Sequence, residues 1–402
     1  MERGSFAIYN GRVITEKAVI RKGGVLVRDG LIEAVFEGDA LPSLASVGRM
    51  DLIDADGRFI SPGFVDLHVH GGGGSDFMDG TEEAIEDICA CHAKGGTTSL
   101  LLTTLTSTDD DLKAALGAYK RRVASPEPIK GARPVGVHME GPYFALSQKG
   151  AQDERFLRNP SADHYVPIME DNPEILRVSA APELGGAIEL GRYLRSRGVL
   201  ASIGHTDASF EQVELAYEAG YGHMTHLYSA MSGVKRVRGR RIAGAVEAGL
   251  AIDGLTVEVI ADGMHLPAGL LRLVLKCKGP DRIALVTDAM RAAGLPDGEY
   301  LLGSGGEGRK VIVDEGVAWL PDRSAFAGSV ALGITLVGNM VRLAGAGVVE
   351  AVRMMSLNPA RMIGLDGSVG SIAEGKIADL TLFDDGFRVS GTFVAGEAVY
   401  RA

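Results

Sequence analysis

Two histidines that lie two residues apart, His68 and His70, end an apolar segment and directly precede the glycine run Gly71–Gly74. In a β-strand, side chains two positions apart point to the same side, so both imidazoles can bind one ion. Taken alone, the pair is also consistent with two hydrogen-bonded histidines in a loop. Ligand-type residues elsewhere in the chain decide between these interpretations.

Four more imidazole or carboxylate side chains lie at the ends of four further apolar segments: Glu140, His205, His226 and Asp288. Ligands of these types, brought together from several strand ends, are typical of a site for a borderline divalent metal, and Zn²⁺ or Fe²⁺ fits best. Asp288 then lies beside the metal and is available to transfer a proton. Together, these six residues predict a metal-dependent active site.

The other histidines carry weaker signals. His265 follows an apolar segment but has no place in the metal set, so we expect it to contact the substrate. His138 shares a strand face with Glu140 and is expected in the barrel interior or behind the ligands. We expect no ligand role for His92, His164 and His223.

Between residues 61 and 365, short apolar segments alternate with helical patterns such as Thr81–Lys94, Leu112–Val123 and Ser209–Ala219. Eight segments are predicted as strands: Phe64–Val69, Thr98–Leu102, Pro134–Met139, Leu176–Ala180, Leu200–Ile203, Gly222–Thr225, Thr256–Ile260 and Ile283–Val286. This alternation predicts an α/β fold with a (β/α)₈ TIM-type barrel, and a doubly wound open sheet is the alternative. Polar residues follow many different strands, which favours the mouth of a barrel.

Both ends of the chain are rich in short strands and turns. Near the start, Asn10-Gly11 and Asp29-Gly30 are predicted as turns between strands, and Asp385-Gly386 is one near the end. We therefore expect residues 1–60 and 366–402 to form one small β-sandwich domain, beside a hydrolase barrel at 61–365. The segment 290–324 is predicted as either a lid over the site or a surface hairpin.

The composition excludes several classes of protein. The chain has 402 residues with 41 Lys+Arg and 52 Asp+Glu, so 41 − 52 gives a net charge of −11, and 46% of residues are hydrophobic. This excludes a disordered chain and argues against nucleic acid as a partner. No apolar run approaches the ~20 residues that span a bilayer, and the start lacks a signal-peptide pattern, so we expect a cytoplasmic protein.

Two local features stand out from this composition. Five basic residues crowd into seven positions, and they form either a solvated loop or a receptor for a phosphate: Lys235, Arg236, Arg238, Arg240 and Arg241. Of the three cysteines, Cys89 and Cys91 lie two apart in a helical pattern and so suit neither a disulfide nor a zinc site.

Seven motifs together resemble the N-acetylglucosamine-6-phosphate deacetylases of the amidohydrolase superfamily. They span most of the chain: Pro62–Gly71, His138–Pro142, Gly204–Thr206, Thr225–Tyr228, Ile260–His265, Leu285–Ala289 and Ala327–Ser329. The His-x-His start is shared by many amidohydrolases, whereas Glu-Gly-Pro and Thr-His-Leu-Tyr are far more specific to the deacetylases. The ending Gly375–Leu380 resembles the superfamily's return to its β-sandwich.

The resemblance implies a role for each matching residue. Glu140, His205 and His226 would hold the principal metal, His68 and His70 a second one, and Asp288 would be the catalytic acid and base, with one or two ions per subunit. Residues around the sugar phosphate would be Ser229, Ala230, Arg238 and His265, and the remaining pocket would be lined by Ala151, Phe326, Ala327 and Gly328. In the family, the arginine reaches a neighbouring subunit's site, which implies a homodimer.

The chain departs from the family pattern at two positions. Ser229 stands where the family usually has Asn, and Gln152 stands where it commonly has His. An imidazole would be the better donor to an oxyanion, although Gln152 or His265 can still serve. The phosphate-binding arginine is either Arg238, which the motif spacing favours, or Arg236.

Several functional alternatives remain open from the sequence. The first is deacetylation of N-acetylgalactosamine 6-phosphate or another N-acyl compound. The second is a different amidohydrolase reaction, such as that of a cyclic amidase or a nucleobase deaminase, because the barrel fold does not determine the substrate. The last is a catalytically inactive scaffold.

Overall fold

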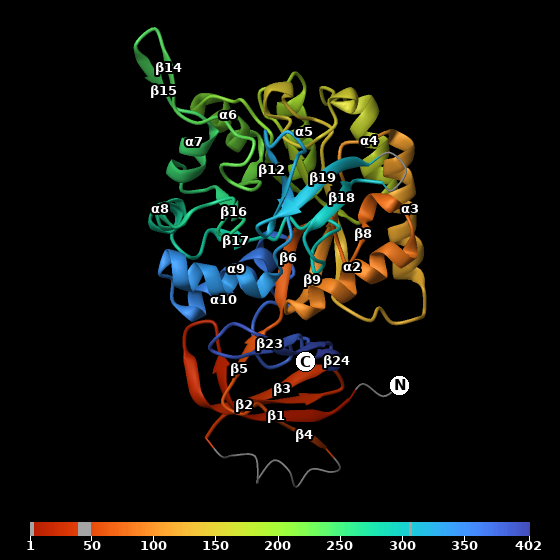
Figure 1. Ribbon diagram of the computed structural model, residues 1–402, viewed down its shortest axis with the longest axis vertical. Coiled ribbons are helices and arrows are strands. Elements are labelled where there is room, and N and C mark those ends of the chain that lie inside the picture. The colour runs from red at the N-terminus through yellow and green to blue at the C-terminus, as the bar shows by residue number, and fades with distance from the viewer. Residues whose placement is uncertain (1–3, 39–49, 305–307) are drawn as a thin grey trace.

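Eight parallel strands form the central sheet of the protein (Figure 1). The computed structural model describes residues 4–38, 50–304 and 308–402. The strands neighbour one another in chain order: β6 (Phe64–Val69), β9 (Thr97–Thr103), β10 (Arg133–Glu140), β11 (Ile175–Ala180), β12 (Leu200–Ile203), β13 (Tyr221–Met224), β16 (Thr256–Val259) and β17 (Ile283–Leu285). All eight predicted strands are present.

Backbone hydrogen bonds join the two edge strands of this sheet. Beyond the end of β17, the Asp288 N–H donates to the His68 carbonyl across 2.9 Å, and the His70 N–H donates to the Ala289 carbonyl across 3.0 Å. Val69 and Ala289 form a parallel bridge. The sheet is therefore closed at its carboxyl end, as in the predicted (β/α)₈ barrel and unlike an open doubly wound sheet.

Helices follow the strands and cover the outside of the barrel: α2 (Glu82–Lys94), α3 (Asp109–Ala124), α4 (Ala162–Asp171), α5 (Ala187–Ser196), α6 (Phe210–Ala219), α7 (Ala245–Ala251), α8 (Ala268–Lys278), α9 (Gly333–Asn339), α10 (Val348–Met355) and α11 (Leu357–Met362). Side chains at the N-caps set where two of the predicted helices begin, because Thr81 accepts from the Ala84 N–H and Ser209 from the Gln212 N–H. None of the helices in the described ranges is both long enough and apolar enough to cross a bilayer.

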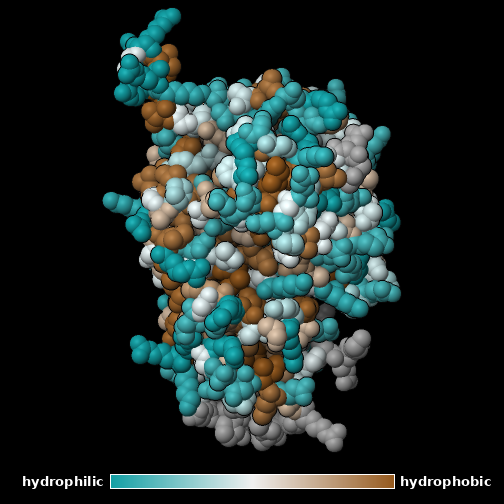
Figure 2. Space-filling model, viewed as in Figure 1, coloured by the Kyte–Doolittle hydropathy of each residue, from teal (hydrophilic) through white to brown (hydrophobic). Residues whose placement is uncertain are grey.

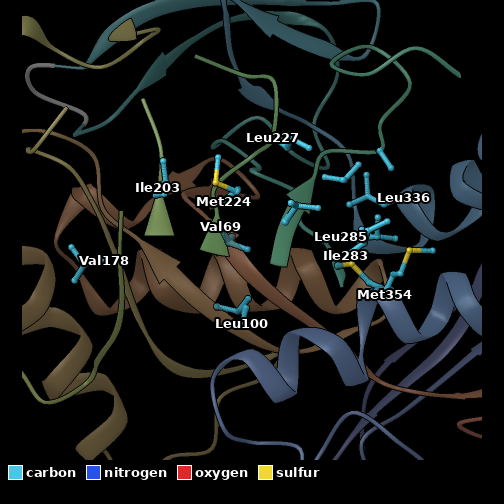
Figure 3. Close-up of a cluster of buried hydrophobic side chains, with 14 of the residues drawn as sticks. Val69, Leu100, Val178, Ile203, Met224, Leu227, Ile283, Leu285, Leu336 and Met354 are labelled. Atoms are coloured by element: carbon cyan, nitrogen blue, oxygen red, sulfur yellow. The ribbon is translucent and has the colours of Figure 1, made fainter. Parts of the chain in front are cut away.

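The main hydrophobic core lies between the barrel strands and these helices. Figure 3 shows Ile283 and Leu285 of β17 in one buried cluster with Leu336 of α9 and Met354 of α10. All four of these residues are fully buried. Because this layer fixes the strands from outside, it also fixes the loops that carry the polar residues at the strand ends.

The strands near both termini pair into one mixed sheet, drawn below the barrel in Figure 1. Its members are β1 (Phe6–Ile14), β2 (Val19–Arg28), β3 (Leu31–Glu37), β4 (Asp51–Asp54), β5 (Phe59–Pro62), β22 (Leu380–Phe383), β23 (Val389–Val394) and β24 (Glu397–Arg401). The rings of Phe6 and Phe393 lie 5.3 Å apart although β22 and β5 separate their strands in the sheet, so the sheet folds over its own core. A β-domain from both termini was predicted; its division at residues 60 and 365 stays a prediction.

One predicted turn in this sheet is wrong. Asn10-Gly11 does not end a strand but forms a bulge inside β1, where the pairing with β2 shifts register. Asn10 has φ 54°, and a Cβ on Gly11 would lie 2.5 Å from Ile60 Cδ1, so the bulge needs the same residue types as a turn does. Asp29-Gly30 does join β2 to β3 as predicted.

Two smaller units project from the barrel. The segment after β17 forms a four-stranded antiparallel sheet of β18 (Gly298–Leu302), β19 (Arg309–Asp314), β20 (Val317–Trp319) and β21 (Phe326–Ser329). It is thus larger than the surface hairpin that was one of the two predictions for 290–324. The hairpin of β14 (Lys235–Val237) and β15 (Arg240–Ile242) extends away from the body (Figure 1), and Figure 2 shows mostly hydrophilic residues on it.

Candidate active site and metal centre

A cavity of about 440 Å³ opens at the carboxyl ends of the barrel strands. Five of the six predicted ligand and catalytic residues line it, namely His70, Glu140, His205, His226 and Asp288. The sixth, His68, is fully buried beneath them. The structure therefore brings together all six residues that the strand-end pattern singled out.

The first donor group consists of Glu140, His205 and His226. Glu140 Oε1 lies 3.1 Å from His226 Nε2 and 3.3 Å from His205 Nε2. Glu140 is the last residue of β10, and each histidine follows its strand by two residues. His205 and His226 have positive φ values of 49° and 29°, a conformation that non-glycine residues rarely adopt and that is common where side chains are aimed into a site.

The second donor group consists of His68, His70 and Asp288. The Nε2 atoms of the two histidines are 3.2 Å apart, and Asp288 Oδ1 lies 3.4 Å from the first and 3.3 Å from the second. The two groups also touch, because Glu140 Oε2 is 3.3 Å from His70 Nε2. One carboxylate thus lies between the two sets of imidazoles.

Hydrogen bonds on the far side of two rings determine which nitrogen faces the carboxylates. His205 Nδ1 is 2.9 Å from the Gln148 carbonyl, and His70 Nδ1 is 3.2 Å from the Thr103 carbonyl. A carbonyl only accepts, so each Nδ1 carries the hydrogen and each Nε2 of the neutral ring presents a lone pair. Lone pairs that face carboxylate oxygens need a cation between them.

The electrostatics of the site agree with this requirement. Although burial alone lowers the pKa of His70, its hydrogen bonds with Asp288 and Glu140 raise that pKa to about 10. The carboxylates therefore draw a positive charge to this point, as a proton or as a metal ion. Buried imidazole and carboxylate donors in two adjoining groups fit a divalent metal ion.

Asp288 is suited to accept a proton. Burial raises the pKa of its carboxyl, but the His68 and His70 rings lower it more, so the net pKa is below the usual value and the group is ionised at neutral pH. Asp288 lines the cavity as well as contacting the second donor group. It therefore lies between the metal ligands and any molecule in the cavity.

The predicted substrate contacts divide into two sets. Seven of them line the cavity: Ala151, Ser229, Ala230, His265, Phe326, Ala327 and Gly328. Arg238 does not; it lies in the turn between β14 and β15 on the exposed hairpin, and Arg236 lies on the same hairpin. His265 is oriented by Asp262, whose Oδ2 is 2.7 Å from its Nδ1.

The remaining histidines lie in neither donor group. His138 Nε2 is 2.7 Å from Ser179 Oγ, and its ring packs edge-on against His68, as expected for a residue behind the ligands. His92 Nε2 is 3.0 Å from the Gly71 carbonyl and His223 Nδ1 is 2.7 Å from Thr256 Oγ1. His164 contacts Tyr143 and Asp109 away from the cavity.

Both donor groups are supported by an acidic residue, Glu258, that was not predicted from the sequence. Glu258 of β16 is 0% exposed and pairs with Arg177 of β11, which is equally buried. Its Oε2 accepts from the His226 backbone N–H across 3.1 Å and lies 3.4 Å from His68 Nδ1. A single acidic residue inside the apolar run Thr256–Ile260 was the signal that could have identified it.

Comparisons with known proteins agree with this geometry. A family model described as "Amidohydrolase family" matches residues 59–399. The chain is 34% identical to an N-acetylgalactosamine-6-phosphate deacetylase of Escherichia coli O157:H7, covering 96% of this chain and 97% of the relative. It is 32% identical to an N-acetylglucosamine-6-phosphate deacetylase of Bacillus subtilis, covering 98% and 97%.

Solved structures show the same likeness. A Mycobacterium smegmatis N-acetyl-D-glucosamine-6-phosphate deacetylase mutant, in complex with N-acetyl-D-glucosamine-6-phosphate, matches with a TM-score of 0.89 and 30% identity. That match covers 98% of this chain and 99% of the other chain. The likeness therefore includes the barrel and the terminal sheet together.

Proposed function

Because this chain belongs to the amidohydrolase family, we propose that it hydrolyses the acetamide of N-acetylglucosamine 6-phosphate to acetate and glucosamine 6-phosphate. The observation that carries the proposal is the position of Asp288, an ionised carboxylate that contacts His68 and His70 and also lines the cavity. Complete donor groups beside it argue against an inactive scaffold.

Glu140, His205 and His226 would hold the principal metal, and His68 and His70 a second one with Asp288 beside it. Zn²⁺ and Fe²⁺ suit these donor types, and one or two ions per subunit are consistent with two adjoining groups. When bound there, the ion supplies Lewis-acid chemistry, making water more acidic and polarising the carbonyl of the amide.

The chain's own residues would move the proton. Asp288 accepts a proton from the attacking water as the new C–O bond forms at the acetamide carbonyl carbon. It then returns that proton to the sugar nitrogen as the C–N bond breaks, so the products are acetate and a free amine. Cavity residues would hold the sugar meanwhile: Ala151, Ser229, Ala230, His265, Phe326, Ala327 and Gly328.

We propose that Arg238 binds the phosphate of a substrate held by a neighbouring subunit in a homodimer. Two observations support this: the arginine does not line its own cavity, and its hairpin extends away from the body (Figure 1). Val234 and Val237 are 57% and 48% exposed there, which leaves apolar side chains for a second copy to cover.

The galacto epimer of the substrate is the second candidate, favoured by the 34% identity to an N-acetylgalactosamine-6-phosphate deacetylase. The two sugars differ only in the orientation of one hydroxyl. We therefore propose to measure acetate release by the metal-loaded protein from both phosphorylated epimers and from unphosphorylated N-acetylglucosamine. The comparison of kcat/KM between the epimers decides which is the substrate.

Rapid release from N-acetylglucosamine 6-phosphate and slow release from the unphosphorylated sugar are expected. Equal rates with and without the phosphate would contradict the phosphate-binding role of the hairpin. An absence of release from every sugar, with metal bound, would direct the search to other N-acyl compounds.

A further inference from the structure

Gln152 is held at both ends of its side-chain amide. It is 4% exposed, and its Oε1 accepts from the Thr106 backbone N–H across 2.9 Å. Its Nε2 donates to Glu140 Oε2 across 2.7 Å. The opposite orientation of the amide would place two donors together and two acceptors together, so the partners themselves fix which end faces Glu140.

The two carboxylate oxygens of Glu140 have different partners. Oε1 lies within 3.3 Å of both His205 Nε2 and His226 Nε2. Oε2 receives the Gln152 amide and also lies 3.3 Å from His70 Nε2. A carboxylate that is held by one oxygen cannot rotate freely, so Oε1 stays directed at the two imidazoles.

The backbone of Gln152 is also fixed. Its carbonyl accepts from Arg309 Nη1 across 3.1 Å, and the neighbouring Ala151 carbonyl accepts from the same nitrogen across 3.2 Å. The Gln152 N–H donates to the Lys149 carbonyl across 3.0 Å. The loop that carries this glutamine is thus fixed independently of Glu140, so the amide can act as a rigid support for the carboxylate.

We propose that Gln152 is a positioning residue that holds Glu140 in the orientation that binds the principal metal. Gln152 also lines the cavity, and its amide nitrogen carries a second hydrogen, so the expectation that it donates to an oxyanion stays a prediction beside this positioning role. The inference rests on the proposed function only in treating Glu140, His205 and His226 as a metal site. Groups behind a metal ligand contribute to affinity by restricting its motion.

The test is Zn²⁺ binding by metal-free Q152M, measured by competition with a chelating dye. Methionine matches glutamine in length but neither donates nor accepts a comparable hydrogen bond. We expect at least one of the bound Zn²⁺ ions to dissociate with a Kd about 10- to 100-fold above the wild-type value. The value of kcat at saturating Zn²⁺ is measured separately, because it reports any contact of the amide with the substrate and not the hold of the amide on Glu140.

Two further variants make the result specific. Q152H restores a side-chain N–H at this position and should recover part of the lost affinity. Q212M is the matched control and should leave the Zn²⁺ affinity unchanged. Gln212 belongs to the N-terminal capping box of α6 and does not line the cavity. Thermal unfolding of the metal-free proteins verifies that Q152M is folded.

Unchanged Kd values in folded Q152M would overturn the proposal. Wild-type Zn²⁺ affinity combined with a large fall in kcat would also overturn it, and would leave Gln152 only the role of a donor to the substrate. Zn²⁺ binding requires no substrate. A wild-type protein that binds Zn²⁺ but releases no acetate would therefore contradict the proposed function while leaving this test intact.

Discussion

The backbone N–H of Asp288 donates to the carbonyl of His68 across 2.9 Å, so main-chain geometry joins the proposed proton-transfer residue to a metal ligand. The Asp288 carbonyl in turn accepts from the Ser329 N–H across 2.8 Å. Asp288 has φ 46°, and these two bonds hold it in that uncommon conformation. Its position therefore does not depend on its own carboxylate.

Replacing Asp288 with Asn should separate catalysis from metal binding. The backbone bonds and the Glu140 group are untouched by D288N, so we expect the principal metal to remain. The amide cannot accept the proton of the attacking water, and kcat should fall by about 10²- to 10⁴-fold. Metal content by elemental analysis and kcat from acetate release provide the check, and near-normal turnover would exclude Asp288 as the proton carrier.

The strand-end pattern predicted the site because each ligand is adjacent in sequence to the strand that positions it. Glu140 ends β10, and His205 and His226 follow β12 and β13 by two residues. An apolar run that stops at an imidazole or a carboxylate is visible without any knowledge of pairing. In a closed parallel barrel, such strand ends necessarily meet.

Features that depend on pairing between distant segments could not be predicted in this way. Arg177 and Glu258 are 81 residues apart, and only closure of the barrel brings them together. The four-stranded sheet after β17 depends on antiparallel pairing that no local pattern in 290–324 specifies. Asn-Gly is favourable both in a β-bulge and in a turn, so the residue types of Asn10-Gly11 do not distinguish the two structures.

Loss of the Glu258 charge should destabilise the protein strongly. E258Q leaves the buried Arg177 guanidinium without its carboxylate, and breaking such a pair costs roughly 3–5 kcal/mol of unfolding free energy. Urea denaturation of the metal-free protein measures the change. The matched control is E33Q, which breaks the exposed pair with Arg28 and should leave the midpoint unchanged. Equal midpoints for E258Q and wild type would contradict the expectation.

His92 should make stability depend on pH. Burial lowers the pKa of this ring to about 4, although the hydrogen bond to the Gly71 carbonyl partly opposes the effect. An unfolded chain binds a proton on this ring below about pH 6.5, whereas the folded protein does so only below about pH 4. The stability from neutral His92 is therefore complete above pH 6.5 and is lost as the pH falls toward 4.

The variant H92Q removes this titration and isolates its effect. As the pH falls through this window, the unfolding free energy of the wild type should decrease relative to that of H92Q by about 1.4 kcal/mol per pH unit. Urea denaturation of both proteins at several values between pH 7 and pH 4 measures it. A difference that stays constant with pH would show that His92 is not the group responsible.

The arginine hairpin predicts complementation between two impaired variants, assayed at a substrate concentration well below the wild-type KM. R238A should raise KM for the phosphorylated sugar by about 10- to 100-fold through loss of a charged hydrogen bond, while D288N lowers kcat by the larger factor given above. If Arg238 acts across a dimer, a mixed dimer holds one complete site, made from Asp288 of the R238A chain and Arg238 of the D288N chain. Chains that are unfolded and refolded together at equal amounts should then regain about a quarter of the wild-type activity, because half of the dimers are mixed and each has one complete site.

If Arg238 serves its own chain, no complete site forms and mixing restores nothing. The same experiment with R236A shows which of the two arginines binds the phosphate.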